Sequence, residues 1–254
     1  ESNEKIIIRA VDVQNASDTV KQVLELIITE DVCDFIETDI RGNITEDLTL
    51  YNLCNPYTII GDLIVANGAT LTIEPGVQIE FEGPYSITVI DGAKLMSLGS
   101  EQDSITISGI SWKGIDIKSP GSMIQYTRII EEGNSSQGDY LLKLTGSHVD
   151  KSHIYGGTKG IQLNDSSIVS RSKIHDIRNE AIQLYQRSVA YGNIIYDIGT
   201  DMNYDGAVQT NDRSYFLNNK VYSTLDDPNM IAVAAQSSGV IAGNTIGSDK
   251  GIHG

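Results

Sequence analysis

The chain has 254 residues, of which 40 % are hydrophobic, and a formal net charge of −16 at pH 7. The hydrophobic content allows a sizeable core and excludes wholesale disorder. The acidity argues against a nucleic-acid partner, because no basic stripe is present to neutralise phosphates. It also disfavours anionic polysaccharide, unless a metal ion or a local basic patch intervenes. No apolar run approaches the roughly 18 residues of a membrane span.

Residues 1–46 differ in pattern from the rest, and we expect an N-terminal cap and linker there. The stretch IIIRAVDVQNASDTVKQVLELIIT (6–29) predicts strands, although Val20, Val23, Leu24 and Ile27 also fit the spacing of an amphipathic helix. Either element could cover the open end of the domain that follows. The chain starts at Glu1 without a signal peptide, which indicates a processed or excised piece.

Cys33 and Cys54 lie 21 residues apart. In a secreted chain we would expect them to form a disulfide, and the alternative is a pair of buried thiols.

Residues 47–254 carry an internal repeat. A polar residue stands two positions before an aliphatic one in each copy, with steps of 25, 20, 21, 26 and 25 residues between copies. The polar members are Thr127, Ser152, Ser172, Asn193, Asn219 and Asn244. Alternating segments such as GIQL (160–163) and AIQL (181–184) form the second half of each copy and indicate strands. A period of this length without helices predicts a parallel β-helix, an all-β solenoid.

The segments YTIIGDLIVANGATLTIEPGVQIEF (57–81), ITVIDGAKLMSLGS (87–100) and SWKGIDI (111–117) resemble the opening coils of right-handed parallel β-helix proteins of the pectate-lyase-like superfamily. This resemblance covers about residues 45–254 and implies the fold and glycan binding along one sheet. It does not imply one activity, because such folds host many functions. Residues 1–30 resemble the closing strands of bacterial Ig-like modules. The chain ends within a repeat, so we expect the natural protein to continue.

Strand alternation assigns each position to the core or to solvent. The polar members of the repeat point inward and predict a buried ladder that links successive coils. The residues between them face solvent in two rows. The basic row is Arg128, His153, Lys173, Ile194 and Lys220, and the aromatic row is Ile130, Tyr155, His175, Tyr196 and Tyr222. A third outward row, Asp116, Lys143, Gln162, Gln183 and Gln209, is interpreted as structural.

Aromatic rings with polar tips suit sugars, which present apolar C–H faces and hydroxyls. We therefore predict a carbohydrate-binding face, with the alternative that stacked side chains only stabilise neighbouring strands. The predicted substrate-binding residues are Tyr155, His175, Tyr196, Tyr222, Lys173 and Lys220.

Motifs of known lyases, polygalacturonases and epimerases with this fold are missing from the sequence. A site could still assemble across coils, with Lys173, His175, Tyr196 and Tyr222 supplying a base and an acid for uronate β-elimination. Asp176 and Asp197 occupy matching places one coil apart and form a weaker candidate dyad for a retaining glycosidase.

The stretch DMNYDGAVQTND (201–212) has the layout of an EF-hand-type calcium loop. Asp201, Asn203, Asp205 and Asp212 would donate side-chain oxygens to Ca²⁺, and Ala207 its carbonyl. The flanking helices of an EF-hand are missing, and an acidic chain also produces such matches by chance.

These patterns predict an extracellular or cell-surface β-helix that binds polysaccharide, with Ca²⁺ as the candidate cofactor. We expect a monomeric part of a longer chain. Two alternatives remain open: a polysaccharide lyase or glycoside hydrolase acting on the same face, and a structural spacer or adhesin stalk. The identity of the glycan stays open as well.

Overall fold

The computed structural model describes residues 7–13, 21–27, 38–133, 140–199, 207–223, 233–235 and 237–248. The chain divides into two compact units, Glu1–Thr38 and Asp39–Gly254. In the first unit, β1 (Ile7–Val13) and β2 (Lys21–Ile27) pair antiparallel, with Ile7 opposite Ile27. Strands rather than a helix are therefore confirmed there. The capping role and the resemblance to an Ig-like module remain predictions.

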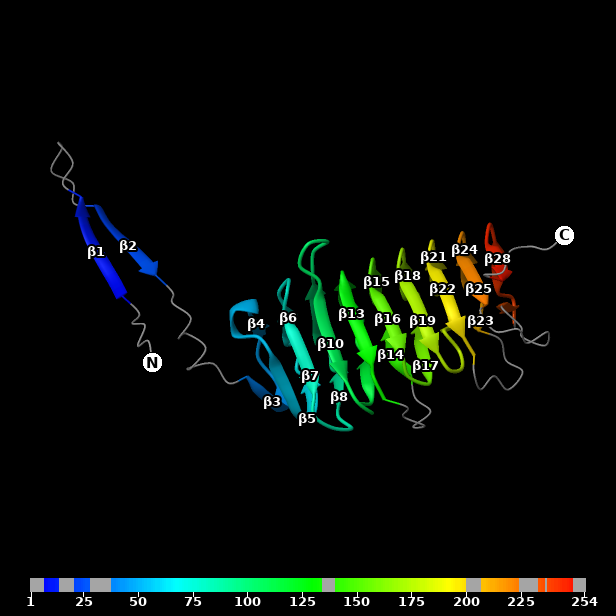
Figure 1. The fold of residues 1–254 in the computed structure, drawn as a ribbon, viewed down its shortest axis with the longest axis horizontal. Helices are drawn as coiled ribbons and strands as arrows, with labels where there is room; N and C mark the ends of the chain where they lie inside the picture. The colour runs from blue at the N-terminus through cyan, green and yellow to red at the C-terminus, as the bar shows by residue number, and fades with distance from the viewer. Residues whose placement is uncertain are drawn as a thin grey trace. The chain divides into compact units, whose positions relative to one another are not determined.

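The second unit is an all-β parallel solenoid of about eight turns, which confirms the predicted fold (Figure 1). Each turn contributes strands to three columns. The first column holds β7 (Gln78–Phe81), β10 (Ile105–Gly109), β13 (Thr127–Glu131), β16 (His153–Gly156), β19 (Lys173–Ile177), β22 (Ile194–Ile198), β25 (Lys220–Ser223) and β28 (Thr245–Ser248). The second holds β8 (Ser86–Val89), β11 (Gly114–Ile117), β14 (Tyr140–Thr145), β17 (Lys159–Asn164), β20 (Ile182–Leu184), β23 (Val208–Thr210) and β26 (Val233–Ala235). The third holds β4 (Leu48–Leu50), β6 (Thr70–Ile73), β9 (Lys94–Leu98), β12 (Met123–Gln125), β15 (His148–Asp150), β18 (Ile168–Ser170), β21 (Val189–Tyr191), β24 (Tyr215–Leu217) and β27 (Val240–Ala242).

The solenoid starts with β3 (Asp39–Ile44), before the predicted boundary at residue 47. This strand pairs in parallel with β5 (Tyr57–Val65), which then pairs with both β7 and β8. One long strand thus bridges the first two columns. The short 3₁₀ turn η2 (Asn52–Cys54) precedes it, and Cys54 is buried and disulfide-bonded rather than free. Cys33 lies outside the described residues.

The core is a stack of aliphatic side chains from consecutive coils. Ile154, Ile174, Ile195 and Val221 are buried at matching positions of the first column, as the alternation predicts. Strands such as β7 (burial of Ile79 and Phe81) and β8 (burial of Ile87 and Val89) bury every second side chain, so their opposite face is left for other groups. No helix of the described residues is long and apolar enough to cross a membrane.

A continuous hydrogen-bonded ladder of polar side chains runs beside this core. Asn219 accepts the backbone N–H of Asn193 at 2.8 Å through Oδ1 and donates through Nδ2 to the Ala190 carbonyl at 3.0 Å. Its own N–H donates to Asn244 Oδ1 at 2.7 Å, so the pattern repeats one coil further. Earlier coils use hydroxyls, since Ser152 Oγ accepts from the Thr127 N–H at 3.2 Å. The predicted ladder is confirmed.

Two kinds of tight turn close each coil. The residue before each ladder member has positive φ, as in Lys151 (φ 47°) and Asn218 (φ 54°). The turn between the second and third columns has two such residues in a row in several coils, for example Asp165 and Ser166, and one in others, such as Gly146. In five consecutive coils a buried serine follows this turn, namely Ser122, Ser147, Ser167, Ser188 and Ser214. The Ser147 hydroxyl accepts the Ser122 N–H at 3.2 Å. This second ladder was not predicted from the sequence.

Replacement of Asn219 tests the first ladder. The change Asn219→Ala leaves the buried N–H of Asn193 without its acceptor, so we expect a loss of about 2–3 kcal/mol in the free energy of unfolding. Lys220→Ala is the matched control, because the side chain is exposed and should change stability by no more than about 0.5 kcal/mol. Urea denaturation of both variants provides the measurement, and equal losses would contradict a stabilising ladder.

Candidate functional site

The outward face of the first column brings the basic and aromatic rows together. In the basic row, Arg128 pairs with His153, which pairs with Lys173 and then, through Ile194, with Lys220. The same registers align the aromatic row from Ile130 to Tyr222. The register predicted from alternation is therefore confirmed. The predicted exposure holds for Arg128, Lys173 and Lys220, whereas Ile130 and His175 of the aromatic row are buried.

The central rings of the aromatic row stack on one another. The centroids of Tyr155 and His175 are 4.9 Å apart with an interplanar angle of 7°, and those of His175 and Tyr196 are 4.5 Å apart at 12°. The His175 ring therefore has a Tyr on each face and is only 8 % exposed. Its faces are occupied by neighbouring rings, and what remains for a ligand are ring edges and polar tips.

Two histidines and a carboxylate form a hydrogen-bonded chain across two coils. His175 Nδ1 lies 2.6 Å from Asp176 Oδ2, and His175 Nε2 lies 2.5 Å from His153 Nε2. The Asp176 carboxylate holds a proton on His175 Nδ1. When both imidazoles are neutral, His175 Nε2 accepts the hydrogen bond that His153 Nε2–H donates. The Nδ1 atom of His153 then carries the free lone pair.

The surroundings keep His153 and Tyr196 uncharged at neutral pH. Burial, followed by the charges of His175, Lys173 and Arg128, lowers the pKa of His153 to about 4, although Asp176 opposes the shift. Burial, with Asp176 and Asp197 nearby, raises the pKa of Tyr196. The face thus combines a neutral imidazole that can accept a proton with a neutral phenol that can donate one.

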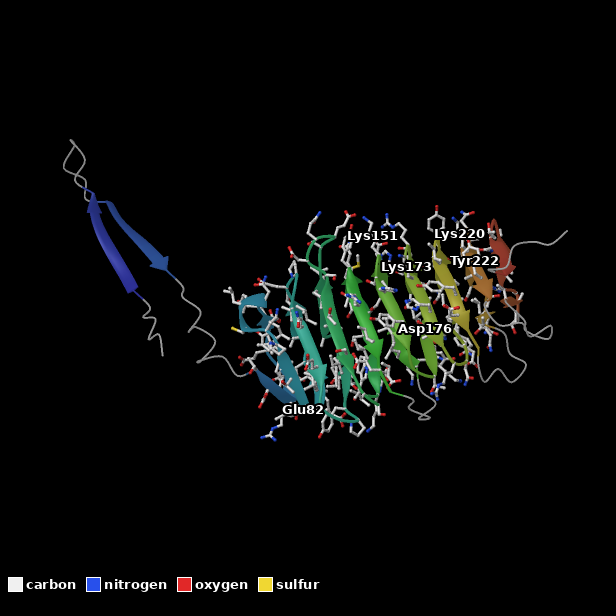
Figure 2. All side chains as sticks on the ribbon, in the orientation of Figure 1. Glu82, Lys151, Lys173, Asp176, Lys220 and Tyr222 are labelled. Carbon is white, nitrogen blue, oxygen red and sulfur yellow. The ribbon has the colours of Figure 1, made fainter. Side chains whose placement is uncertain are left out.

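Three cations line the same face. Arg128, Lys173 and Lys220 are exposed, and the Arg128 guanidinium donates to the Tyr155 hydroxyl at 3.2 Å. Figure 2 shows Lys173 and Asp176 on β19, with Lys220 and Tyr222 two coils further on β25. Coils repeat about every 4.8 Å, so the three cations are spaced to contact a ligand that extends along the solenoid.

Asp176 and Asp197 lie one residue before the ends of β19 and β22, at the predicted matching positions. Both have positive φ (53° and 52°), a conformation that the short side chain of Asp tolerates better than most residues do. Asp176 orients His175, and both carboxylates act on the pKa of Tyr196. Their role as a catalytic dyad stays a prediction.

The row of amides on the second column bonds to itself. Gln183 Nε2 donates to Gln209 Oε1 at 2.8 Å, and Gln162 approaches Gln183 at 3.5 Å. The Tyr185 hydroxyl also donates to Gln183 at 3.1 Å. These contacts agree with the structural interpretation of this row.

The predicted calcium loop is only partly within the described residues. Asp201, Asn203 and Asp205 lie outside them. Ala207 is buried, and its carbonyl accepts the N–H groups of Ala181 (2.8 Å) and Ile182 (3.3 Å). Asp212 lies beyond β23 in a turn with positive φ, and its carbonyl accepts from the Arg187 N–H. Both residues therefore have roles in the coil, and calcium binding stays a prediction.

Arg128 and His153 were placed in the basic row by the sequence but were not singled out as site residues. The signal that could have identified His153 is its diagonal position relative to His175 on the neighbouring strand. It pairs with Lys173, and His175 follows two positions later, within reach of a long side chain across the strands. Arg128 could have been found from its position in line with Lys173 and Lys220.

A scan against protein-family models finds no match, and no curated protein sequence matches the chain. Among solved structures, the periplasmic alginate epimerase AlgG aligns with 80 % of this chain and 73 % of its own, at 10 % identity and a TM-score of 0.31. A double-mutant form of AlgG aligns with 82 % and 77 %, at 10 % identity and a TM-score of 0.27. At these values the similarity carries no argument about function.

The depressed pKa of His153 predicts a pH dependence of stability. The unfolded chain takes up a proton on this residue below about pH 6.5, whereas the folded chain does so only near pH 4. The stability that depends on neutral His153 is thus complete above pH 6.5 and is lost as the pH falls toward 4. Between pH 7 and pH 4.5, the wild type should lose about 2–3 kcal/mol more than His153→Gln in urea denaturation. Parallel pH profiles for the two proteins would contradict the shifted pKa.

Proposed function

We propose that this chain binds an acidic polysaccharide along the outward face of β13, β16, β19, β22 and β25. The observation that carries the proposal is the alignment of three exposed cations beside a row of stacked rings on one rigid sheet. Cations that repeat with the coil suit a polymer that repeats its carboxylates. They also form the local basic patch that an acidic chain needs for such a ligand.

The stacking of the rings favours an acidic sugar over a neutral one. Neutral sugars are held largely through their C–H faces on exposed ring faces. Here the faces of His175 are covered by Tyr155 and Tyr196. The groups left to meet a ligand are donors, namely phenol hydroxyls, Lys ammonium groups and the Arg128 guanidinium, which match carboxylate and hydroxyl oxygens.

An extracellular or cell-surface location belongs to this proposal. The disulfide at Cys54 supports it, because structural disulfides persist mainly in oxidising compartments. A monomeric state is part of the same proposal.

Binding can be tested with Lys173→Gln. Loss of one charge-assisted contact should weaken binding of a polyuronate by about tenfold, since such contacts contribute on the order of 1.5 kcal/mol. Lys118→Gln is the matched control, because it removes an exposed cation near the end of β11 in the second column. Isothermal titration calorimetry with polyuronate and with a neutral glucan provides the measurement. Equal affinities for both variants, or preference for the neutral glucan, would overturn the proposal.

A second candidate function, uronate β-elimination, is favoured by the chain Asp176–His175–His153. The free lone pair of His153 Nδ1 could take the C5 proton of a uronate while Arg128 or Lys173 neutralises its carboxylate. The C4–O bond would then break, a C4–C5 double bond would form, and the neutral phenol of Tyr196 could protonate the leaving oxygen. The low pKa of His153 makes it a weak base, but one whose Nδ1 atom is unprotonated at neutral pH.

Elimination has its own readout in the ultraviolet absorbance of the unsaturated ends that it leaves. If the chain is a lyase, His153→Gln should reduce the rate at least about a hundredfold, because a positioned base contributes roughly that much. His148→Gln, which alters a histidine on β15 of the third column, should leave the rate unchanged. Binding without any absorbance change would leave binding as the function, and absence of both would favour the structural spacer.

A further inference from the structure

We infer that His153 and His175 form a binding site for a divalent first-row transition metal such as Zn²⁺, with Asp176 as the supporting carboxylate. The two side chains come from β16 and β19 and approach each other diagonally across adjacent strands. Their Nε2 atoms face each other at 2.5 Å. This site is distinct from the predicted calcium loop, and it requires no polysaccharide.

The distance between the two nitrogens suits a shared ion after a small movement. Two imidazole nitrogens about 2.1 Å from one tetrahedral ion lie roughly 3.3 Å apart. The pair must therefore open by less than about 1 Å. His153 is partly exposed and not stacked face to face, since its ring is tilted by 47° to Tyr155 and 49° to His175. Rotation of this one side chain can supply the movement.

The other histidine is held ready as a ligand. Asp176 fixes the proton on His175 Nδ1 at 2.6 Å, which leaves the lone pair on Nε2. A carboxylate behind the distal nitrogen is the arrangement that orients and strengthens metal-binding histidines. The two stacked Tyr rings and the low exposure of His175 restrict rotation of the imidazole, so little freedom is lost when it binds an ion.

The chemistry of the ligands selects the class of ion. Imidazole nitrogen suits Zn²⁺, Cu²⁺ and Ni²⁺, whereas Ca²⁺ and Mg²⁺ prefer oxygen. The described residues hold no group of three or more His, Cys, Asp or Glu side chains that could enclose an ion. The site therefore supplies two protein ligands and leaves positions for water or for a ligand carboxylate.

Neighbouring charges set the strength of binding. Arg128 and Lys173 stand beside the pair and repel a cation, while Asp176 attracts it. Because Lys173 is not a ligand, Lys173→Gln should tighten binding of Zn²⁺ roughly twofold by removing that repulsion. The same variant should weaken binding of polyuronate, so failure of this inference and failure of the proposed function give different results.

Titration of the apo chain with Zn²⁺, in the presence of excess Ca²⁺, tests the site by calorimetry. His153→Gln and His175→Gln should each weaken Zn²⁺ binding by more than tenfold, and Asp176→Asn by about tenfold, the effect typical of a supporting carboxylate. The variant His148→Gln/His253→Gln removes the two other histidines of the chain and should bind as the wild type does. Circular dichroism and thermal melting establish that each variant is folded.

A spectroscopic measurement keeps the inference testable even if a variant does not fold. Electron paramagnetic resonance of the wild type with one equivalent of Cu²⁺ should show coupling to two imidazole nitrogens. Coupling to fewer than two, undiminished Zn²⁺ binding in His153→Gln and His175→Gln, or loss of binding in His148→Gln/His253→Gln would each overturn the site.

Discussion

The hydrogen bonds between buried polar side chains of successive coils are the interaction on which the rest of the structure depends. The Asn193–Asn219–Asn244 ladder joins backbone N–H groups of one coil to side chains of the next. A one-residue slip between strands would exchange their inward and outward faces. The ladder opposes such a slip, because it would leave buried donors without acceptors. The outward rows are aligned for the same reason.

Alignment has a double effect on the aromatic row. Stacking of Tyr155, His175 and Tyr196 stabilises neighbouring coils, as cross-strand pairs commonly do. It also covers the ring faces and leaves donors and cations as the groups available to a ligand. A chain with a net charge of −16 thus presents an exposed line of Arg128, Lys173 and Lys220 on one face. The contrast between global and local charge is the main physical reason to favour an acidic ligand on this face.

Strand alternation and repeat spacing were sufficient to predict the strands of the first two columns, the polar ladder and the register of both outward rows. They could not predict ring orientation, because a side chain's rotamer depends on its neighbours in three dimensions. The Tyr155–His175 stack and the contact between His153 and His175 therefore appeared only with the structure. Periodicity also gave no signal for the hydrogen bonds of the second ladder, although its serines recur in five consecutive coils. Residues 201–206, the acidic first half of the predicted calcium loop, interrupt the sequence repeat, so strand alternation made no prediction for them.

The neutral state of His153 connects the two proposals. His153 remains uncharged because burial and adjacent cations lower its pKa, so its nitrogens can accept a proton or bind a metal ion. An ion held by His153 and His175 would add positive charge beside Arg128 and Lys173. The metal site would then strengthen the attraction of the face for carboxylates, while each activity could still exist without the other.

The most direct test of the account is a crystal structure of the chain with a bound oligouronate. We predict that the oligosaccharide lies along the solenoid axis over β16, β19, β22 and β25, with its carboxylates next to Arg128, Lys173 or Lys220. An oligosaccharide bound instead on the second or third column, away from these cations, would contradict the account.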